Sequence, residues 1–115
     1  MQLTLDEQLN AGIILQSLII TRTTISYSEF ADCLKLTGPQ KINRIVAWLE
    51  KITLEDICAG MPLRACMVIS KQTPGLPSSG FFLFCAEMGI FDWQNDFTKA
   101  QIFINSQKDM LFSAR

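Results

Sequence analysis

The chain has 115 residues, a length typical of one domain built on one hydrophobic core. Hydrophobic residues make up 49% of the chain and charged residues 18%, which excludes an intrinsically disordered protein. The net charge is −1, so binding to nucleic acid would have to depend on a local basic patch. We expect a single domain over residues 1–115.

The sequence shows no signal for a membrane or for secretion. No apolar run reaches the roughly 18 to 20 residues that a membrane-spanning helix needs. Met1 to Asn10 contains no Lys or Arg and carries Asp6 and Glu7, whereas a secretory signal begins with basic residues. We expect a cytoplasmic protein with no membrane partner.

The residues that usually build metal and catalytic sites are sparse. Cys33, Cys58, Cys66 and Cys85 form no CxxC pair, and the chain has no histidine. We therefore expect no metal and no cofactor, and interpret the cysteines as small buried side chains in a reducing compartment. No nucleophile–base pair, phosphate loop or paired-carboxylate motif can be picked out, so we expect a protein that is not an enzyme. Carboxylates distant in sequence can still meet in space.

A capping box marks the start of the first predicted helix. Thr4 and Glu7 have the spacing at which each side chain bonds the other residue's backbone N–H. A mostly apolar stripe at helical spacing then predicts a helix from about Leu5 to Thr21.

A second capping box, Ser26 with Glu29, marks the next helix. Ile25 before the cap and Phe30 inside the helix fit a hydrophobic staple. This helix is short and is expected to end near Lys35-Leu36.

Thr37-Gly38 predicts a tight turn, and Pro39 suits the first position of a third helix. The helix is predicted to run to Ala59, followed by Gly60, unless Thr53 caps a separate last turn. Its apolar stripe is Ile42, Ile45, Val46, Leu49 and Ile52. Two helices joined by a short Gly-containing turn are typical of a helix-turn-helix.

Two β-prone runs follow, Leu63 to Ser70 and Phe81 to Glu87, separated by the Pro- and Gly-rich loop Lys71 to Gly80. Three helices followed by a β-hairpin predict an α+β fold of the winged helix-turn-helix type. A further C-terminal helix is predicted from about Asp92 or Asp96 to Phe112.

The turn and the start of the third helix carry the candidate DNA contacts. Side chains of these types read base edges or phosphates when the second helix of the motif enters the major groove. The competing interpretation is the ordinary polar face of a surface helix. The candidates are Lys35, Thr37, Gln40, Lys41, Asn43 and Arg44, with Lys71 in the loop.

The loop from Lys71 to Gly80 is long enough to suggest a function, and Ser78-Ser79-Gly80 offers hydrogen-bond donors for a phosphate. Lys71 is its only basic residue, however, so a Pro-stiffened connection is an equally good interpretation. Phe91, Trp93 and Phe112 are candidates for a partner interface, with packing in the core as the alternative for Trp93.

One resemblance rests on two runs of residues. The second predicted helix begins Ile25-Ser26-Tyr27-Ser28-Glu29-Phe30-Ala31, and Gly38-Pro39 is followed by Asn43-Arg44-Ile45-Val46. Residues 25–52 thus resemble the DNA-binding part of the DNA alkyltransferase and alkyltransferase-like families, in which a SYGELA helix start precedes an ARAVG-type helix. The resemblance implies that this helix-turn-helix binds DNA. It also implies that Arg44 matches the arginine that pushes into the duplex to stabilise a flipped nucleotide.

The chain departs from those families at the catalytic segment. Their Pro-Cys-His-Arg run corresponds here to MPLRAC, from Met61 to Cys66. No histidine follows Cys66 to activate its thiol, so alkyl transfer is not expected. The resemblance implies a non-enzymatic module on a DNA-binding scaffold.

The leading hypothesis is therefore a non-enzymatic DNA-binding winged-helix protein, a regulator or accessory factor of bacterial or phage origin. The alternative is a protein–protein interaction module on the same scaffold without DNA affinity, whose partner is another protein or a second copy. Near balance of charge from Ile25 to Lys71, six basic against five acidic residues, favours the alternative.

Overall fold

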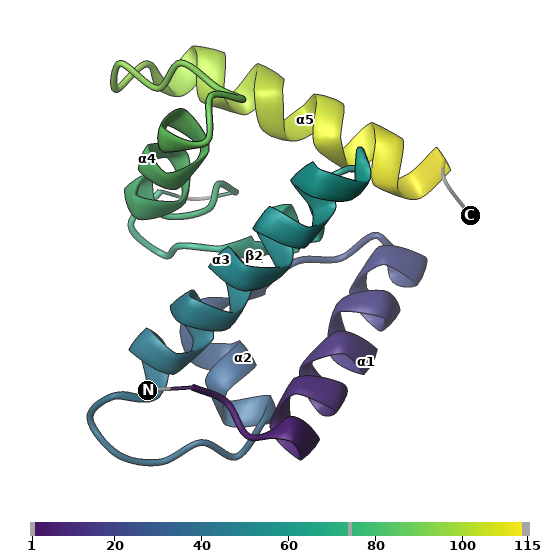
Figure 1. Cartoon of the computed structure of the whole chain (residues 1–115), viewed down its shortest axis with the longest axis vertical. Helices are drawn as coiled ribbons and strands as arrows, with labels where there is room; N and C mark the ends of the chain where they lie inside the picture. Colours follow the sequence, from purple (N-terminus) through teal and green to yellow (C-terminus); the bar gives the residue numbers. More distant parts are fainter. Residues whose placement is uncertain (1, 74, 114–115) are drawn as a thin grey trace.

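The computed structural model describes residues 2–73 and 75–113. These residues form a mostly helical α+β fold with five α-helices, one 3₁₀-helix and a two-stranded parallel sheet. The predicted α+β class is therefore confirmed. In chain order the elements are α1 (Leu5–Thr21), β1 (Ile25–Ser26), α2 (Tyr27–Cys33), α3 (Lys41–Ala59), the 3₁₀-helix η1 (Arg64–Met67), β2 (Val68–Ile69), α4 (Ser79–Glu87) and α5 (Phe97–Ser113). Figure 1 shows α3 crossing the molecule, with α1 and α2 toward one end and α4 and α5 toward the other.

Both predicted capping boxes are confirmed. Thr4 accepts from the backbone N–H of Glu7, and the Glu7 carboxylate accepts from the N–H of Thr4. Ser26 and Glu29 make the same reciprocal pair at the start of α2. These bonds to Ser26 also lower the pKa of the Glu29 carboxyl. The two caps fix the starts of α1 and α2 because they satisfy N–H groups that have no partner within the helix.

The end of α3 was predicted correctly and its start was not. Ala59 is the last residue, and Gly60 adopts the left-handed conformation (φ 68°) that closes the helix. The helix begins at Lys41, so Pro39 lies in the preceding connection and not at the first helical position. Thr53 does not cap a separate turn, since its hydroxyl donates to the Leu49 carbonyl within one continuous helix.

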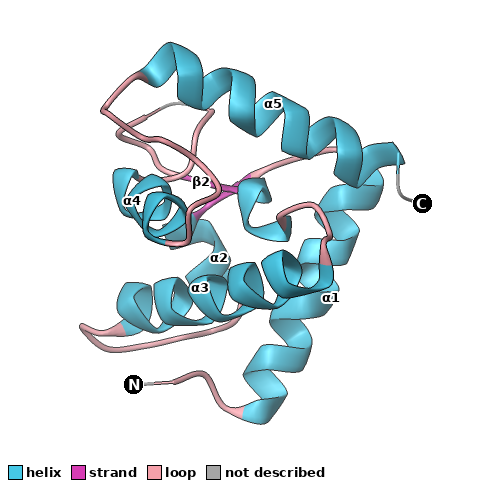
Figure 2. Cartoon of the chain, turned by 45° about the horizontal axis from the view of Figure 1, so that its top comes forward, coloured by secondary structure: helices cyan, strands magenta, loops and turns pink. Residues whose placement is uncertain are grey.

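The expected strand from Leu63 to Ser70 is wrong for most of its length. Only Val68–Ile69 is a strand, and it pairs in parallel with β1, Ile25 opposite Val68 and Ser26 opposite Ile69. Ahead of it, backbone N–H groups bond to side chains instead of to a neighbouring strand: Leu63 donates to Gln107 and Arg64 donates to Asp56. These contacts turn the segment into η1. Figure 2 shows the two short strands in the middle of the molecule, with helices around them.

The run from Phe81 to Glu87 forms a helix, so the predicted β-hairpin wing is wrong within the described residues. As α4, this run turns Phe81, Phe82 and Cys85 into the core and leaves Leu83 exposed. An alternating strand would have placed Leu83 on the same face as Phe81 and Cys85. A short, almost wholly apolar run has no periodicity that separates the two structures, and tertiary packing decides.

The C-terminal helix is confirmed as α5. The buried apolar side chains form one cluster, to which all five α-helices contribute. The largest fully buried members include Phe30, Ile45, Met67, Phe82 and Ile104. No helix in the two described ranges combines the length and the apolar run that crossing a bilayer requires.

Candidate functional site

The connection between α2 and α3 exposes several of the predicted DNA contacts. Lys35 has a left-handed backbone (φ 58°), and the N–H groups on either side of this bend bond back to α2, Lys35 to Asp32 and Leu36 to Ala31. This arrangement closes α2 as a Schellman motif, buries Leu36 and leaves Lys35 exposed. The connection thus presents a lysine at its surface.

Polar side chains continue from this connection into α3. Thr37, Gln40 and Asn43 are exposed, and the Asn43 side-chain amide donates to the Gln40 side-chain oxygen at 2.6 Å. Lys41 is half-buried. Gln40 makes no side-chain cap bond to the first N–H groups of α3. Six of the seven predicted contacts therefore lie together at this end of the molecule.

Arg44 belongs to this group but is already engaged. Its guanidinium forms an ion pair with the Glu7 carboxylate, and its Nε donates to the Gln2 carbonyl at 3.4 Å. The Arg44 side chain is only 18% exposed. The ion pair therefore links the start of α3 to the start of α1. To contact a phosphate, the Arg44 guanidinium would have to leave the Glu7 carboxylate.

Lys71 lies apart from the other six residues. It is exposed, and its positive charge contributes to lowering the pKa of Glu29 on the first turn of α2. The structure thus places Lys71 after β2 and not on a hairpin wing.

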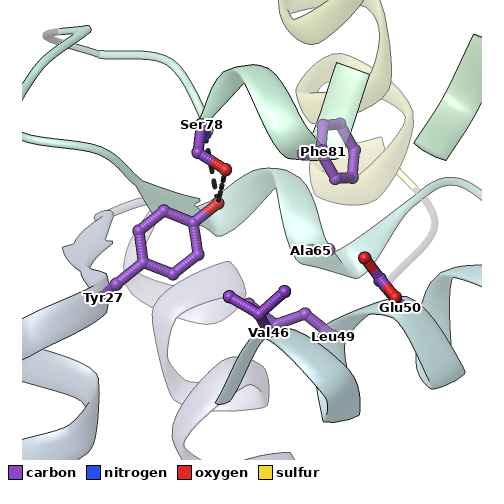
Figure 3. Close-up of a pocket in the computed structure, with 7 residues that line it drawn as sticks. All are labelled: Tyr27, Val46, Leu49, Glu50, Ala65, Ser78 and Phe81. Atoms are coloured by element: carbon purple, nitrogen blue, oxygen red, sulfur yellow. Dashed lines mark hydrogen bonds between the residues drawn. The ribbon is translucent and has the colours of Figure 1, made fainter. Parts of the chain in front are cut away.

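A narrow hollow adjoins the other face of α3. Figure 3 shows Tyr27 and Ser78 joined by hydrogen bonds at one end and Glu50 and Phe81 at the other. The Tyr27 hydroxyl accepts from the Ser78 N–H at 3.1 Å and donates to the Ser78 Oγ at 3.3 Å. The full lining is Tyr27, Val46, Leu49, Glu50, Ala65, Ser78 and Phe81.

The hollow has a cavity volume of about 20 Å³, which is room for about one water molecule. Burial raises the pKa of Tyr27, so its phenol stays protonated at neutral pH. The only carboxylate of the lining is Glu50, which is exposed, so the hollow contains no paired acid and base.

Sequence reasoning missed this hollow. Tyr27 opens the second predicted helix and Ser78 lies in the predicted loop from Lys71 to Gly80, and no pattern in the sequence links the two. The available signal was a tyrosine at a helix start, because a half-buried phenol needs a hydrogen-bond partner.

The residues predicted for a partner interface pack in or against the hydrophobic core. Trp93 is buried and stacks on Phe82, with ring centroids 4.8 Å apart. Phe91 is half-buried and stacks on Phe103 at 4.5 Å. Phe112 is also half-buried and lies under the Arg22 guanidinium. Trp93 therefore follows the core-packing alternative.

The cysteines and carboxylates do not converge. Across residues 2–73 and 75–113, no group of three or more His, Cys, Asp or Glu side chains is placed to hold a metal ion. The expectation of four buried cysteines is wrong for Cys33 and Cys58, which are exposed, and is confirmed for Cys66 and Cys85. Burial raises the pKa of both buried thiols, that of Cys85 to about 12. Both stay protonated and are poor nucleophiles near neutral pH.

The buried carboxylate of Asp56 has a structural partner. It accepts from the backbone N–H and the guanidinium of Arg64, with Nε–O distances of 3.1 Å. This pair joins η1 to α3. It also lines a cavity of about 300 Å³ between α1, α3 and α5, whose other lining residues are Gln16, Ile19, Met61, Pro62 and Leu111.

Comparisons with known proteins match this chain to no protein-family model, no curated protein sequence and no solved structure.

Proposed function

We propose that the protein is a non-enzymatic DNA-binding protein, which contacts the duplex through the α2–α3 connection and the first turn of α3. In this proposal α2 and α3 act as a helix-turn-helix, and the protein serves as a regulator or accessory factor. The hairpin wing has no part in it.

The charge distribution carries the proposal. From Cys33 to Leu49 the chain has three basic residues, Lys35, Lys41 and Arg44, and no acidic residue. Within the described part of the chain, neither Lys35 nor Lys41 lies in an ion pair. Basic side chains next to exposed amides are the combination that contacts phosphates and base edges. This run of basic residues supports a local excess of positive charge on a chain whose net charge is −1.

The resemblance of residues 25–52 to the DNA-binding part of alkyltransferase-like proteins supports the same surface. Its arginine position falls on Arg44, at the edge of the exposed polar residues. Because Arg44 is paired with Glu7, its guanidinium can contact DNA in this proposal only after the ion pair has opened. DNA competes with Glu7 for the guanidinium.

Fluorescence anisotropy with labelled random-sequence duplex and single-stranded DNA tests the proposal. Lys41→Ala and Arg44→Ala should each weaken binding and reduce its dependence on salt, because each removes about one phosphate contact. Lys99→Ala is the matched control, since it removes the same charge from α5, where Lys99 pairs with Asp92 at 3.6 Å. Equal affinity of all three variants and the parent would reject this surface.

A second candidate function is a protein–protein interaction module without DNA affinity. It is favoured by the large apolar side chains that α1 leaves exposed, Leu5, Leu9, Ile13 and Ile20. Absence of DNA binding at low salt, with association that Ile13→Glu abolishes, would favour this candidate.

A further inference from the structure

A stripe on the outer face of α1 is apolar and exposed, beside the exposed polar residues Asp6, Asn10 and Ser17. Leu5, Leu9, Ile13 and Ile20 are between 51% and 73% exposed. The opposite face of the same helix is buried through Ala11, Leu15 and Ile19. A surface helix usually turns polar residues outward, and a helix that is apolar all round is usually covered on both sides.

We propose that a second copy of this chain covers this face, with the two α1 helices packed antiparallel about a two-fold axis. The stripe consists of residues 5, 9, 12/13, 16 and 20, so its spacing reads the same from either end. In antiparallel pairing Leu5 meets Ile20 of the other copy and Leu9 meets Gln16. A two-fold interface requires such a self-complementary surface.

Gly12 lies near the centre of the stripe and permits close approach. A Cβ built on it would have no neighbour within 4 Å, so its lack of a side chain serves no contact within the chain. Glycine in a helix interior costs about 1 kcal/mol relative to alanine. In the proposed dimer Gly12 lies where the two α1 helices cross, and its lack of a side chain lets the two backbones approach each other. This contact accounts for a glycine at this position.

The charges of α1 select the antiparallel orientation. Acidic residues lie only in its first turn, at Asp6 and Glu7, and the C-cap is Arg22. Because Glu7 is engaged by Arg44, Asp6 is the acidic residue that can approach Arg22 of the other copy. Antiparallel pairing brings the acidic end of one copy to the basic end of the other and opposes the two helix dipoles. Parallel pairing would bring like charges together. The same acidic end argues against an anionic membrane as the occupant, because membrane-surface helices are rich in Lys and Arg.

The neighbouring groove enlarges the surface. The outer face of a helix of this length measures about 25 Å by about 10 Å, an area of about 250 Å². This area is smaller than the roughly 800 Å² that each partner buries in a specific interface. A groove between α1 and α3, lined in part by Leu9, Gly12, Lys51 and Glu55, adjoins the stripe. Two copies that use both the stripe and the groove should form a weak dimer with a micromolar dissociation constant.

Sedimentation velocity over a hundredfold range of micromolar concentrations tests the dimer. The parent should shift from monomer to dimer, and Leu9→Glu and Ile13→Glu should each remain monomeric. Ile102→Glu is the matched control, because Ile102 is equally exposed but lies on α5. A parent that stays monomeric throughout overturns the proposal, and so does a dimer that Ile102→Glu disrupts and Ile13→Glu does not.

Disulfide trapping tests the orientation. In a background with the exposed Cys33 and Cys58 changed to Ser, Leu9→Cys and Gln16→Cys chains are mixed and oxidised. The antiparallel arrangement predicts that the mixed 9–16 disulfide forms at least tenfold faster than the 9–9 disulfide. Faster 9–9 formation would contradict it. Neither outcome depends on DNA, so the dimer and the proposed DNA binding fail or succeed separately.

Discussion

Arg44 in the first turn of α3 and Glu7 in the first turn of α1 form an ion pair that joins the two helix starts. The same Glu7 carboxylate completes the capping box with Thr4. One side chain therefore caps α1 and pairs with a basic residue in the first turn of α3. Any function that uses the Arg44 guanidinium must therefore compete with Glu7 for it.

Glu7→Gln separates the two roles of this side chain. Glutamine also completes a capping box, so α1 should keep its cap while Arg44 loses its anionic partner. We expect tighter DNA binding with a steeper salt dependence, and a stability loss of at most about 1 kcal/mol because the pair is partly exposed. Anisotropy and urea unfolding measure the two effects. Weaker DNA binding by Glu7→Gln would show that the pair assists the contact and does not compete with it.

Phe82→Ala tests the replacement of the predicted strand by α4. Phe82 is fully buried and contacts Phe81, Phe91 and Trp93, so we expect a loss of about 3–5 kcal/mol in the free energy of unfolding. Leu83→Ala is the control and should cost well under 1 kcal/mol, because Leu83 is exposed on α4. Urea unfolding of both variants checks this. A large loss for Leu83→Ala would favour a different secondary structure for the segment.

Tyr27→Phe tests the contact that closes the hollow beside α3. Removal of the hydroxyl leaves the Ser78 N–H without its acceptor, so we expect a loss of about 1–2 kcal/mol in stability. Ser78→Ala should cost less, since the backbone N–H keeps its bond to Tyr27. The two variants and their double mutant form a cycle in urea unfolding. Equal losses for the two single variants would place the contact in the Ser78 hydroxyl instead.

The cysteines predict a pH dependence. Burial raises the pKa of Cys85 to about 12 from an ordinary value of 9.0, and it raises that of Cys66 as well. Above pH 9 the unfolded chain releases thiol protons that the folded chain retains, so stability is present in full below pH 9 and falls as the pH rises further. Each thiol accounts for about 1.4 kcal/mol lost per pH unit above that point.

Urea unfolding at pH 7 and pH 10 under reducing conditions measures this loss. Cys85→Ala provides the control, because it should show a smaller difference between the two pH values than the parent does. In the native protein, a thiol reagent should modify the exposed Cys33 and Cys58 rapidly and the buried pair slowly. Rapid modification of all four thiols without unfolding would contradict the burial of Cys66 and Cys85.

Local signals in the sequence predicted α1, α2, the end of α3 and α5, but not α4. The capping boxes at Thr4 and Ser26 and the glycine at position 60 act over a few residues, so they mark the helix ends without knowledge of the rest of the fold. Longer-range determinants were not predictable in this way. The strand Val68–Ile69 forms because Ile25–Ser26 pairs with it. The two segments are more than 40 residues apart, and no pattern within either of them predicts the pairing.

The sequence indicated which residues of the candidate site lie at the surface, but not which contacts their side chains make. Sequence reasoning placed Lys35, Gln40 and Asn43 on a surface, and they are exposed. It gave no indication that Glu7 would engage Arg44, because residue type alone does not fix which charges meet in space. The apolar stripe on α1 predicted the helix correctly, but an apolar pattern alone does not say whether a face is covered or exposed.

The salt dependence of DNA binding by the parent protein tests the central claim most directly. We expect anisotropy with a random-sequence duplex to show micromolar or tighter binding at low salt. The logarithm of the binding constant should fall linearly with the logarithm of salt concentration, with a slope of about −2 to −3, since Lys35, Lys41 and Arg44 supply the contacts. No binding at low salt, or binding that salt does not weaken, would contradict a DNA-binding surface at the start of α3.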